Sequence, residues 1–412
     1  MSLKSISAII GDLAKAQPDW PAISHETMSI TRLELHQSTN RLARAYQGLG
    51  VQEGDFVTIA LPNSIEFYQA CIATWKLGAT PQPISAKLPR VEQIAIVSLA
   101  EPALLVGSGA NLALGVQTLP ANFMPDPALS DADLPDKVSR FWKAPTSGGS
   151  TGRPKIIVSE IPGCFDFSQD KPLQQEFDRA QLVPGPLYHN GPFSFSMNGL
   201  FLGNHIVVMT RFDAEQTLAL IEAHDIDWMM MVPTMMSRIW KLPDEIRLKY
   251  DLSSLRVMLH LAAPCPPWLK EKWIDWLGGD RIHELFGGTE GTGATWITGD
   301  EWLAHRGSVG KLLGGAKVKV VNEQGETLPD GEIGEIYLLP PGGQGSTYHY
   351  IGAESSGLDG GWESLGDMGY VDSQGYLYLS DRKTDMILAG GANIYPAEIE
   401  AAIDTHPLVR SS

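Results

Sequence analysis

The sequence predicts an α/β fold, in which two parallel α/β subdomains are followed by an antiparallel β subdomain. Up to about residue 305, short apolar segments alternate with amphipathic helical segments, which is typical of parallel strands joined by helical crossovers. From about residue 306, short strands are instead separated by turn signals, which is typical of antiparallel hairpins. The 412 residues are enough to build several such units.

The first strand–helix–strand unit is expected after a helix over residues 31–50, whose apolar side chains share one face and whose C-cap is Gly50. The segment "DFVTIAL" from Asp55 has the composition of a buried strand. The segment "NSIEFYQACIATWKLG" begins with an Asn/Ser cap and ends at Gly78, so it predicts a helix. Because "ATPQPIS" then returns to an extended pattern, the two strands are expected to be parallel.

The middle of the chain repeats this order. We expect strands at "NHIVVMT", "DWMMMVP" and "SLRVMLHLAA", with a capped helix at "DAEQTLALIEAHD". The later segments "AKVKVVNEQGETLPDGEIGEIYLLP" and "GYVDSQGYLYLSDR" contain the turn signals NEQG, PDG and DSQG. A last helix is expected in "ANIYPAEIEAAIDTHPLVRSS", with Pro396 in its first turn.

Composition narrows the function classes. The formal net charge of -17 disfavours nucleic acid or an anionic membrane surface as the main partner. Three scattered cysteines without CxxC spacing argue against a disulfide framework. Asp12 and Lys15 interrupt the N-terminal segment too early for a secretory signal, and Glu101 and Pro102 interrupt the most apolar long window. We therefore expect a cytoplasmic chain without a membrane span.

The stretch "PTSGGSTGRPKIIV" at residues 145–158 has the residue types of a phosphate-binding loop. It is not a Walker A motif, because Arg153 and Pro154 separate Gly152 from Lys155. Glycines still let backbone N–H groups approach phosphate oxygens, and hydroxyl groups and one lysine add donors. The alternative is a flexible linker, but linkers rarely end in Pro-Lys followed by an apolar strand.

Two further loops carry single carboxylates. In "ELFGGTEGTG", Glu290 beside a bound phosphate would require a divalent cation between them, which indicates Mg²⁺, and Thr289 offers a hydroxyl donor to a phosphate. In "WESLGDMGYV", Asp367 lies in a glycine-flanked turn, where a carboxylate is suited to accept both hydroxyls of a ribose. Taken alone, each could equally be an ordinary solvated loop or turn residue.

In their order and spacing, these stretches resemble the adenylate-forming superfamily of acyl-CoA synthetases, carrier-protein adenylation domains and firefly-type luciferases. The motifs are "TSGGSTGRPK", "FGGTE", "GEIGEIYL", "LGDMGY" and "SDRKTDMILAGGANIYPAEIE". The resemblance implies the adenylate-forming enzyme fold. It implies a large adenylation domain over residues 1–382, with α/β subdomains at about 1–305 and the β subdomain at about 306–382. Residues 383–412 would then be a hinge and the start of a shortened C-terminal domain.

Such enzymes use ATP and Mg²⁺ to convert a carboxylic acid to an acyl-adenylate, release pyrophosphate and pass the acyl group to a thiol, usually CoA. The resemblance assigns the catalytic roles to Lys155, Thr289 and Glu290, with Glu290 holding Mg²⁺. The implied ATP- and AMP-binding residues are Thr146, Ser147, Gly148, Gly149, Ser150, Thr151, Gly152, Ala262, Ala263, Pro264, Glu284, Leu285, Phe286, Thr289, Asp367, Leu379 and Arg382.

The end of the chain departs from the family pattern. The resemblance places the hinge at Lys383 or Thr384, and Gly390 and Gly391 beside the CoA pantetheine arm. The lysine that bridges the acid and the α-phosphate in the family's C-terminal domain has no counterpart here. We therefore expect the chain by itself to bind nucleotide and acid but to adenylate poorly, as part of a longer enzyme.

The resemblance also locates the acid. The stretch "PLYHNGPFSFSMNGLFLG" has no aspartate to hold a substrate amine, which favours an acid without an α-amine. The predicted acid-binding residues are His189, Asn190, Phe193, Met235, Gly287 and Gly288. We expect a bulky hydrophobic acid, as in bile-acid-type and fatty-acyl CoA ligases, although His189, the phenylalanines and the methionines would equally suit a core.

Two other functions fit the same motifs. A carrier-protein loading ligase would use the same first step and pass the acyl group to an acyl carrier protein. A non-catalytic nucleotide- or acid-binding protein would fit the missing lysine, but not the presence of Lys155, Glu290 and Arg382. Transfer of the acyl group to CoA would separate a CoA ligase from a carrier-protein loading ligase. Pyrophosphate release would separate either enzyme from a non-catalytic binding protein. The resemblance is also compatible with a homodimer.

Overall fold

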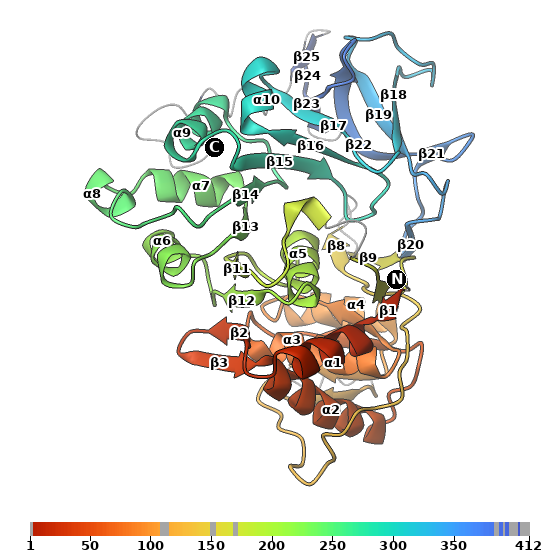
Figure 1. Cartoon of the computed structure of the whole chain (residues 1–412). Coiled ribbons are helices and arrows are strands. Elements are labelled where there is room, and N and C mark those ends of the chain that lie inside the picture. The colour runs from red at the N-terminus through yellow and green to blue at the C-terminus, as the bar shows by residue number, and fades with distance from the viewer. Residues whose placement is uncertain are drawn as a thin grey trace. The chain divides into compact units, whose positions relative to one another are not determined.

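The fold is a mixed α/β architecture, seen in a computed structural model (Figure 1). The structure describes residues 3–107, 115–148, 154–167, 172–382, 387–389, 392–394 and 403. By its internal contacts the chain divides into two compact units. The first contains residues 1–213, 219–228 and 348–354, and the second contains residues 214–218, 229–347 and 355–412. The chain passes between the units within α6 (Ala214–Ala223) and β13 (Trp228–Met231).

The first unit is built on parallel sheets. Its helical segments are α1 (Ile6–Ala16), α2 (Arg32–Gly48), α3 (Ile65–Lys76), α4 (Arg90–Ala100), α5 (Asn190–Phe201) and the 3-10 turn η1 (Pro172–Gln174). Its strands are β1 (Lys4–Ser5), β2 (Pro21–His25), β3 (Met28–Thr31), β4 (Phe56–Ile59), β5 (Thr80–Pro83), β6 (Leu104–Val106), β7 (Gln117–Leu119), β8 (Thr146–Gly148), β9 (Pro154–Ser159), β10 (Cys164–Phe165), β11 (Ala180–Val183), β12 (His205–Val208) and β20 (Tyr348–Ile351).

One sheet of this unit has the order β5-β4-β6-β7, and all its pairs are parallel. Helix α3 connects β4 to β5, and α4 connects β5 to β6, so the predicted helical crossovers are confirmed. In the second group of strands, β11, β12 and β2 are parallel and β3 pairs antiparallel with β2. The phosphate-loop region forms a separate antiparallel sheet with the order β20-β9-β8.

Helix α2 begins where the sequence predicts. The Thr31 hydroxyl accepts a hydrogen bond from the backbone N–H of Glu34, and the Glu34 carboxylate accepts one from the N–H of Thr31. This reciprocal capping box satisfies two N–H groups that the first helical turn leaves without partners. Ser64 likewise accepts from the N–H of Phe67 and caps α3.

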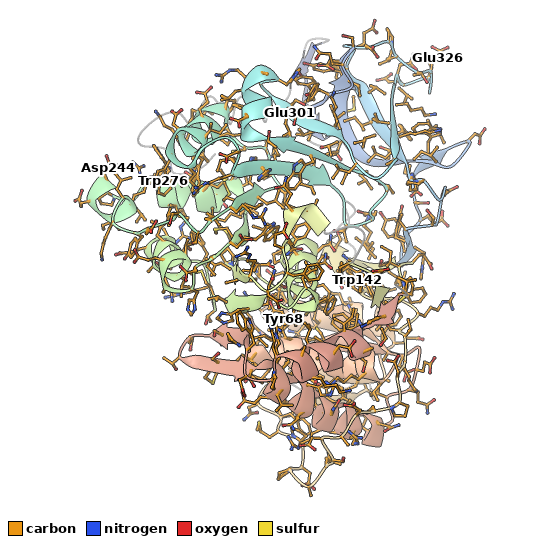
Figure 2. All side chains as sticks on the ribbon, in the orientation of Figure 1. Tyr68, Trp142, Asp244, Trp276, Glu301 and Glu326 are labelled. Carbon is orange, nitrogen blue, oxygen red and sulfur yellow. The ribbon has the colours of Figure 1, made fainter. Side chains whose placement is uncertain are left out.

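Aromatic side chains fill the core of the first unit. The Phe193 ring lies edge-on to those of Phe67 and Trp75, with ring centroids 6.2 and 6.1 Å away. Trp142, labelled in Figure 2, packs against the same ring at 6.0 Å, and its backbone carbonyl accepts a 2.7 Å hydrogen bond from the Trp75 indole. Such contacts add directional aromatic attraction to the burial of large apolar surfaces.

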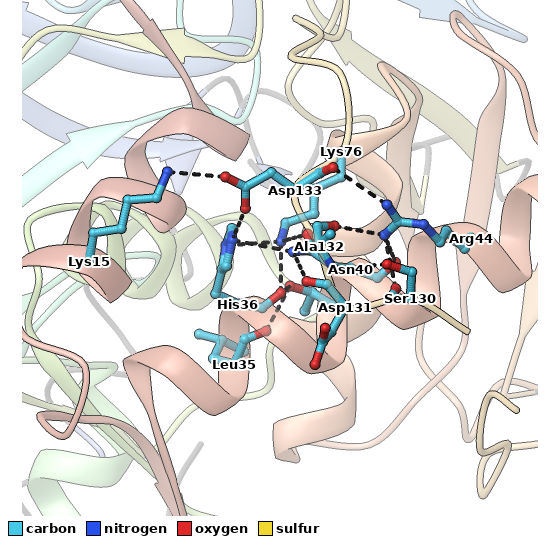
Figure 3. A network of polar contacts seen from close by, with 11 residues as sticks. Lys15, Leu35, His36, Asn40, Arg44, Lys76, Ser130, Asp131, Ala132 and Asp133 are labelled. Carbon is cyan, nitrogen blue, oxygen red and sulfur yellow. Dashed lines mark hydrogen bonds and ion pairs between the residues drawn. The ribbon is translucent and has the colours of Figure 1, made fainter. Parts of the chain in front are cut away.

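A buried polar network joins helices α2 and α3 to the segment 130–133 (Figure 3). Lys76, whose residue is only 1% exposed, donates to Asn40 Oδ1 at 2.5 Å and to the backbone carbonyl of His36 at 3.0 Å. Its Nζ also lies 3.2 Å from His36 Nδ1, while His36 Nε2 lies 2.7 Å from the Asp133 carboxylate. Burial lowers the pKa of Lys76 to about 7.

The second unit is mostly antiparallel. Its strands are β14 (Val257–His260), β15 (Ile282–Gly287), β16 (Ala294–Thr298), β17 (Ser308–Leu312), β18 (Lys317–Val321), β19 (Gly334–Leu339), β21 (Gly357–Leu358), β22 (Trp362–Val371), β23 (Leu377–Arg382), β24 (Ile387–Ala389) and β25 (Ala392–Ile394). Its other helices are α7 (Pro233–Trp240), α8 (Asp244–Arg247), α9 (Pro267–Leu277) and α10 (Gly299–Ala304).

Among the strands listed for the second unit, β14 and β15 pair in parallel. From β15 the sheet continues antiparallel through β16, β17, β23, β22, β19 and β18, with β21 also on β22. The antiparallel pairing begins at β16, before the predicted boundary at residue 306. The predicted α/β fold class with an antiparallel part is confirmed. The expected helix in "ANIYPAEIEAAIDTHPLVRSS" lies almost entirely outside the described residues.

Two further predictions concern the whole chain. Cys71 is buried, Cys164 and Cys265 are half-buried, and all three are free thiols. In the part of the chain that the structure describes, no helix combines the length and apolar character needed to span a bilayer.

Candidate nucleotide and acid site

The phosphate-loop motif forms the two strands of a hairpin. Ser147 on β8 stands opposite Lys155 on β9, and Gly148 stands opposite Pro154. Directly opposed residues of an antiparallel pair point to the same face, so Ser147 and Lys155 share one face of this sheet. The intervening predicted residues, Gly149, Ser150, Thr151 and Gly152, lie outside the described residues.

A buried glutamine anchors this hairpin. Gln82 on β5 donates from Nε2 to the Thr146 hydroxyl at 2.8 Å, and its Oε1 accepts from the Thr58 hydroxyl at 2.5 Å. Gln82 and Thr58 are fully buried, so these bonds form without competing water. Gln82 is not among the residues predicted from the sequence. Its signal is a polar side chain between two prolines inside the extended stretch "ATPQPIS".

Lys155 lies over an aromatic ring. Its Nζ is 4.0 Å from the ring centroid of Tyr350, which belongs to β20 beside β9. A cation at this distance from a ring face is attracted by the quadrupole of the ring. Tyr350 was also missed, because it is far from Lys155 in sequence.

Three predicted acid-binding residues gather in the first turn of α5. His189 is the N-cap residue, and its ring centroid lies 4.3 Å from that of Tyr188. Burial lowers the pKa of His189, so the imidazole is neutral at pH 7. Asn190 is half-buried, whereas Phe193 lies inside the aromatic core. Their contact with an acid stays a prediction.

Lys143 is a buried cation beside this turn that the sequence analysis missed. Only 7% of the residue is exposed, and Nζ donates to Asn190 Oδ1 and, at 2.5 Å, to the Ser194 hydroxyl. The ammonium also lies 4.4 Å from the Trp142 ring centroid. Burial lowers the pKa of Lys143 to about 7. The signal for it was a charged side chain in the apolar run "FWKAP".

In the second unit, β15 brings the "ELFGG" residues to the edge of the loop at 288–293. The Glu284 carboxylate is buried and accepts from Lys270 Nζ on α9 at 2.5 Å, so its side chain faces a lysine within the unit. Leu285 stands opposite Trp296. Phe286 is half-buried and packs against an apolar cluster on β17, β19 and β23.

The loop after β15 is tight around Glu290. A Cβ atom on Gly288 would lie 2.3 Å from Leu365 Cδ1 and 2.9 Å from Glu290 Oε2. Gly287 is exposed, Thr289 is half-buried, and Glu290 is only 8% exposed. The absence of a side chain at 288 therefore lets the Glu290 carboxylate occupy this position.

Two more predicted segments belong to the same unit. Ala262, Ala263 and Pro264 form an exposed loop after β14, and Ala262 has φ +75°. A non-glycine residue in this left-handed region stores backbone strain, which occurs often at binding loops. Asp367 on β22 stands opposite Arg382 on β23.

The remaining predicted residues are dispersed. Leu379 on β23 stands opposite Gly369, and Met235 on α7 is half-buried beside the buried Met236. The hinge residues Lys383 and Thr384 and the CoA-binding residues Gly390 and Gly391 lie outside the described residues. The roles of all these side chains stay predictions.

Curated relatives match almost the whole chain. It is 27% identical over 398 residues to the 2-succinylbenzoate–CoA ligase of Bacillus cereus strain AH820, with 95% of this chain and 81% of the relative covered. It is 28% identical over 415 residues to the 2-succinylbenzoate–CoA ligase of Bacillus licheniformis, with 96% of this chain and 83% of the relative covered.

Solved structures share the fold. The o-succinylbenzoate CoA synthetase (MenE) of Bacillus subtilis in complex with the acyl-adenylate intermediate OSB-AMP has a TM-score of 0.83 at 24% identity, covering 100% of this chain and 85% of that one. The N-terminal domain of FACL13 from Mycobacterium tuberculosis has a TM-score of 0.77 at 21% identity, covering 92% of this chain and 100% of that one. The predicted adenylate-forming fold is therefore confirmed.

The family follows from a match over most of the chain. The family model described as "AMP-binding enzyme" matches residues 12–348. Together with the relatives, this match confirms the resemblance and the predicted enzyme class, an AMP-forming acid–thiol ligase. The chain belongs to the AMP-binding enzyme family.

Proposed function

We propose that this chain activates an aromatic carboxylic acid with ATP and transfers the acyl group to CoA. A carboxylate oxygen attacks the α-phosphorus of ATP, and the bond from that phosphorus to the oxygen bridging to the β-phosphate breaks. The products are an acyl-adenylate and pyrophosphate. The CoA sulfur, as thiolate, then attacks the acyl carbon, and AMP leaves with the electron pair of the broken carbon–oxygen bond.

The observation that carries the proposal is the β8–β9 hairpin. It sets Ser147 and Lys155 opposite each other at the two ends of a loop rich in glycine, serine and threonine. A hydroxyl, an ammonium group and closely approaching backbone N–H groups are the donors that phosphate oxygens require. We assign the β- and γ-phosphates to this loop, with Gln82 fixing its first strand.

Glu290 fits a magnesium ion that arrives with the nucleotide. Among the described residues no three His, Cys, Asp or Glu side chains gather into a metal cage. Mg²⁺ commonly takes only one or two protein carboxylates and completes its shell with phosphate oxygens and water. A single buried carboxylate beside Thr289 suits that arrangement. When bound, the ion would neutralise charge on the departing pyrophosphate.

The acid is proposed from the relatives and from the first turn of α5. The relatives named above are ligases of 2-succinylbenzoate, an aromatic acid without an amine. Here Tyr188, neutral His189 and Asn190 line the turn, and none of them carries a negative charge that would hold a substrate ammonium group. We therefore propose 2-succinylbenzoate or a similar oxygen-bearing aromatic acid.

Pyrophosphate release with a panel of acids tests the proposal. The panel contains 2-succinylbenzoate, benzoate, a long-chain fatty acid and a steroid carboxylic acid. The chain is assayed alone and extended by the C-terminal segment of the Bacillus licheniformis relative, because the match covers 83% of that protein. We expect release to be greatest with 2-succinylbenzoate, and CoA to convert the product to a thioester and AMP.

The Glu290→Ala variant is expected to lower pyrophosphate release by about a hundredfold or more, because one carboxylate ligand of the metal is lost. Glu332→Ala is the matched control, since Glu332 is an exposed glutamate in a turn of the same unit.

If neither the chain alone nor the extended chain releases pyrophosphate with any acid, while calorimetry still detects ATP binding, the proposal is wrong. Transfer to an acyl carrier protein instead of CoA would show that the proposed acceptor is wrong but would leave the proposed adenylation step intact.

A further inference from the structure

The Lys143 cluster is an unusual feature of the first unit. Its Nζ has two oxygen partners and one ring face, and none of these is an anion. Among the described residues, no carboxylate forms an ion pair with Lys143. A buried ammonium group without a counter-charge is costly to fold, so a purely structural role would be better served by an apolar side chain.

The cluster fixes which way the Asn190 amide faces. The charged amine of Lys143 has only donors, so the Asn190 atom that it contacts has to be the carbonyl oxygen Oδ1. The Ser194 hydroxyl donates to the same oxygen at 3.1 Å. If the amide were flipped, its NH₂ group would face two other donors, the Lys143 ammonium group and the Ser194 hydroxyl. The orientation therefore follows from the chemistry of the partners and not from the shape of the amide.

With Oδ1 occupied, Asn190 has only the two N–H groups of Nδ2 left to offer. Its side chain is half-buried, and among the described residues no acceptor is bonded to Nδ2. The next residue on one side is His189, the N-cap of α5. An unused donor in this turn matches an oxygen acceptor on a ligand and opposes an amine.

We infer that Lys143 is a positioning residue for acid recognition: it locks Asn190 as a hydrogen-bond donor, so that the site selects acids bearing a carbonyl or carboxylate oxygen next to the ring over acids bearing an amine there. This inference rests on the proposed function, because it assigns the α5 turn to the acid. Ser194 supports the lock by donating to the same oxygen.

The test compares two benzoates of similar shape, one with an ortho oxo side chain and one with the oxo group replaced by an amine-bearing carbon. KM and kcat for pyrophosphate release are measured at about pH 6, where Lys143 is protonated. Three variants are compared with the wild type: Asn190→Asp, Lys143→Met and Lys76→Met. Lys76 is the matched control, because it is also buried and its pKa is also lowered to about 7.

The wild type is expected to prefer the oxo acid. In Asn190→Asp, the carboxylate keeps its bonds to Lys143 and Ser194 but offers only acceptors, so the preference should fall by about tenfold or reverse, through KM rather than kcat. Lys143→Met frees the amide to turn, and the preference should shrink toward unity. Lys76→Met should lose stability but keep the wild-type preference.

An unchanged preference in Asn190→Asp would overturn the inference, even if Lys143→Met failed to fold. Loss of the preference in Lys76→Met as well would overturn it too, because the effect would then be general loosening. If neither the wild-type chain nor its extended form releases pyrophosphate with any acid, the proposed function fails instead. The two failures are thus distinguishable.

Discussion

Gly288 shows how one missing side chain governs a neighbouring carboxylate. The space that its Cβ atom would fill is already occupied by Leu365 and by the Glu290 carboxylate, whose Oε2 would lie 2.9 Å away. Leu365 Cδ1 and Glu290 Oε2 are both the ends of flexible side chains, so a methyl group at residue 288 would displace the Leu365 side chain, the Glu290 side chain or both. The position of the Glu290 carboxylate therefore depends on the absence of a side chain at residue 288.

Gly288→Ala is expected to lower kcat for pyrophosphate release by about tenfold or more, because the added methyl group would crowd the Glu290 carboxylate. The free energy of unfolding should fall by an amount at the low end of the range of about 1–3 kcal/mol for overpacking, because the crowded atoms are the ends of flexible side chains. Gly48→Ala is the control, since no atom lies within 4 Å of a Cβ atom at that position. Unchanged kcat in Gly288→Ala, measured beside a denaturation curve, would show that Glu290 need not stay where it is.

At the scale of elements, the network in Figure 3 ties the segment 130–133 to helix α2. Lys76 can only donate when charged, so His36 Nδ1 is the acceptor and the ring is neutral, with Nε2–H donating to Asp133. Burial lowers the pKa of His36, with the Lys76 charge acting in the same direction. Hydrogen bonds from His36, which has the larger effect, and from Lys15 lower the pKa of Asp133 to about 2.

This arrangement predicts the pH dependence of stability. Below about pH 6.5 the unfolded chain binds a proton at His36 that the folded chain resists, so the free energy of unfolding decreases as the pH falls. His36→Gln preserves an acceptor toward Lys76 and a donor toward Asp133 but does not titrate. Between about pH 5 and 6, its urea-unfolding free energy should therefore fall less steeply than that of the wild type.

The matched control for this measurement is His305→Gln, whose ring stacks on Tyr376 in the other unit. Other histidines with lowered pKa values, such as His205 and His283, also contribute to the pH dependence of the unfolding free energy, so part of the slope remains in every variant. Equal slopes in His36→Gln and the wild type would contradict a neutral, acceptor role for His36. A slope that changes only in His305→Gln would do the same.

Elements fixed by local signals were predictable. Helix α2 follows its Thr31 cap, α3 follows its Ser64 cap, and the crossovers between β4, β5 and β6 follow from alternation along the chain. The residues that hold the hairpin and the α5 turn were not predictable in this way. Gln82, Tyr350 and Lys143 act through partners that are distant in sequence, and their local context gives only a polar residue in an apolar run.

At the scale of the whole molecule, the motifs identify the family more securely than any single residue identifies the site. The family match spans residues 12–348, whereas the predicted hinge and CoA-binding residues lie outside the described part of the chain. The net charge of -17 is compatible with the proposed chemistry, in which local donors such as Lys155, rather than an overall positive field, would meet the anionic nucleotide.

The central claim is that the acid attacks the α-phosphorus of ATP. It is tested most directly with 2-succinylbenzoate labelled with ¹⁸O in its carboxylates, incubated with ATP, Mg²⁺ and CoA, with the nucleotide products analysed by mass spectrometry. The account predicts AMP that carries a single ¹⁸O atom, because one carboxylate oxygen stays on the α-phosphate when CoA displaces it. ADP with labelled inorganic phosphate, or unlabelled AMP, would contradict it.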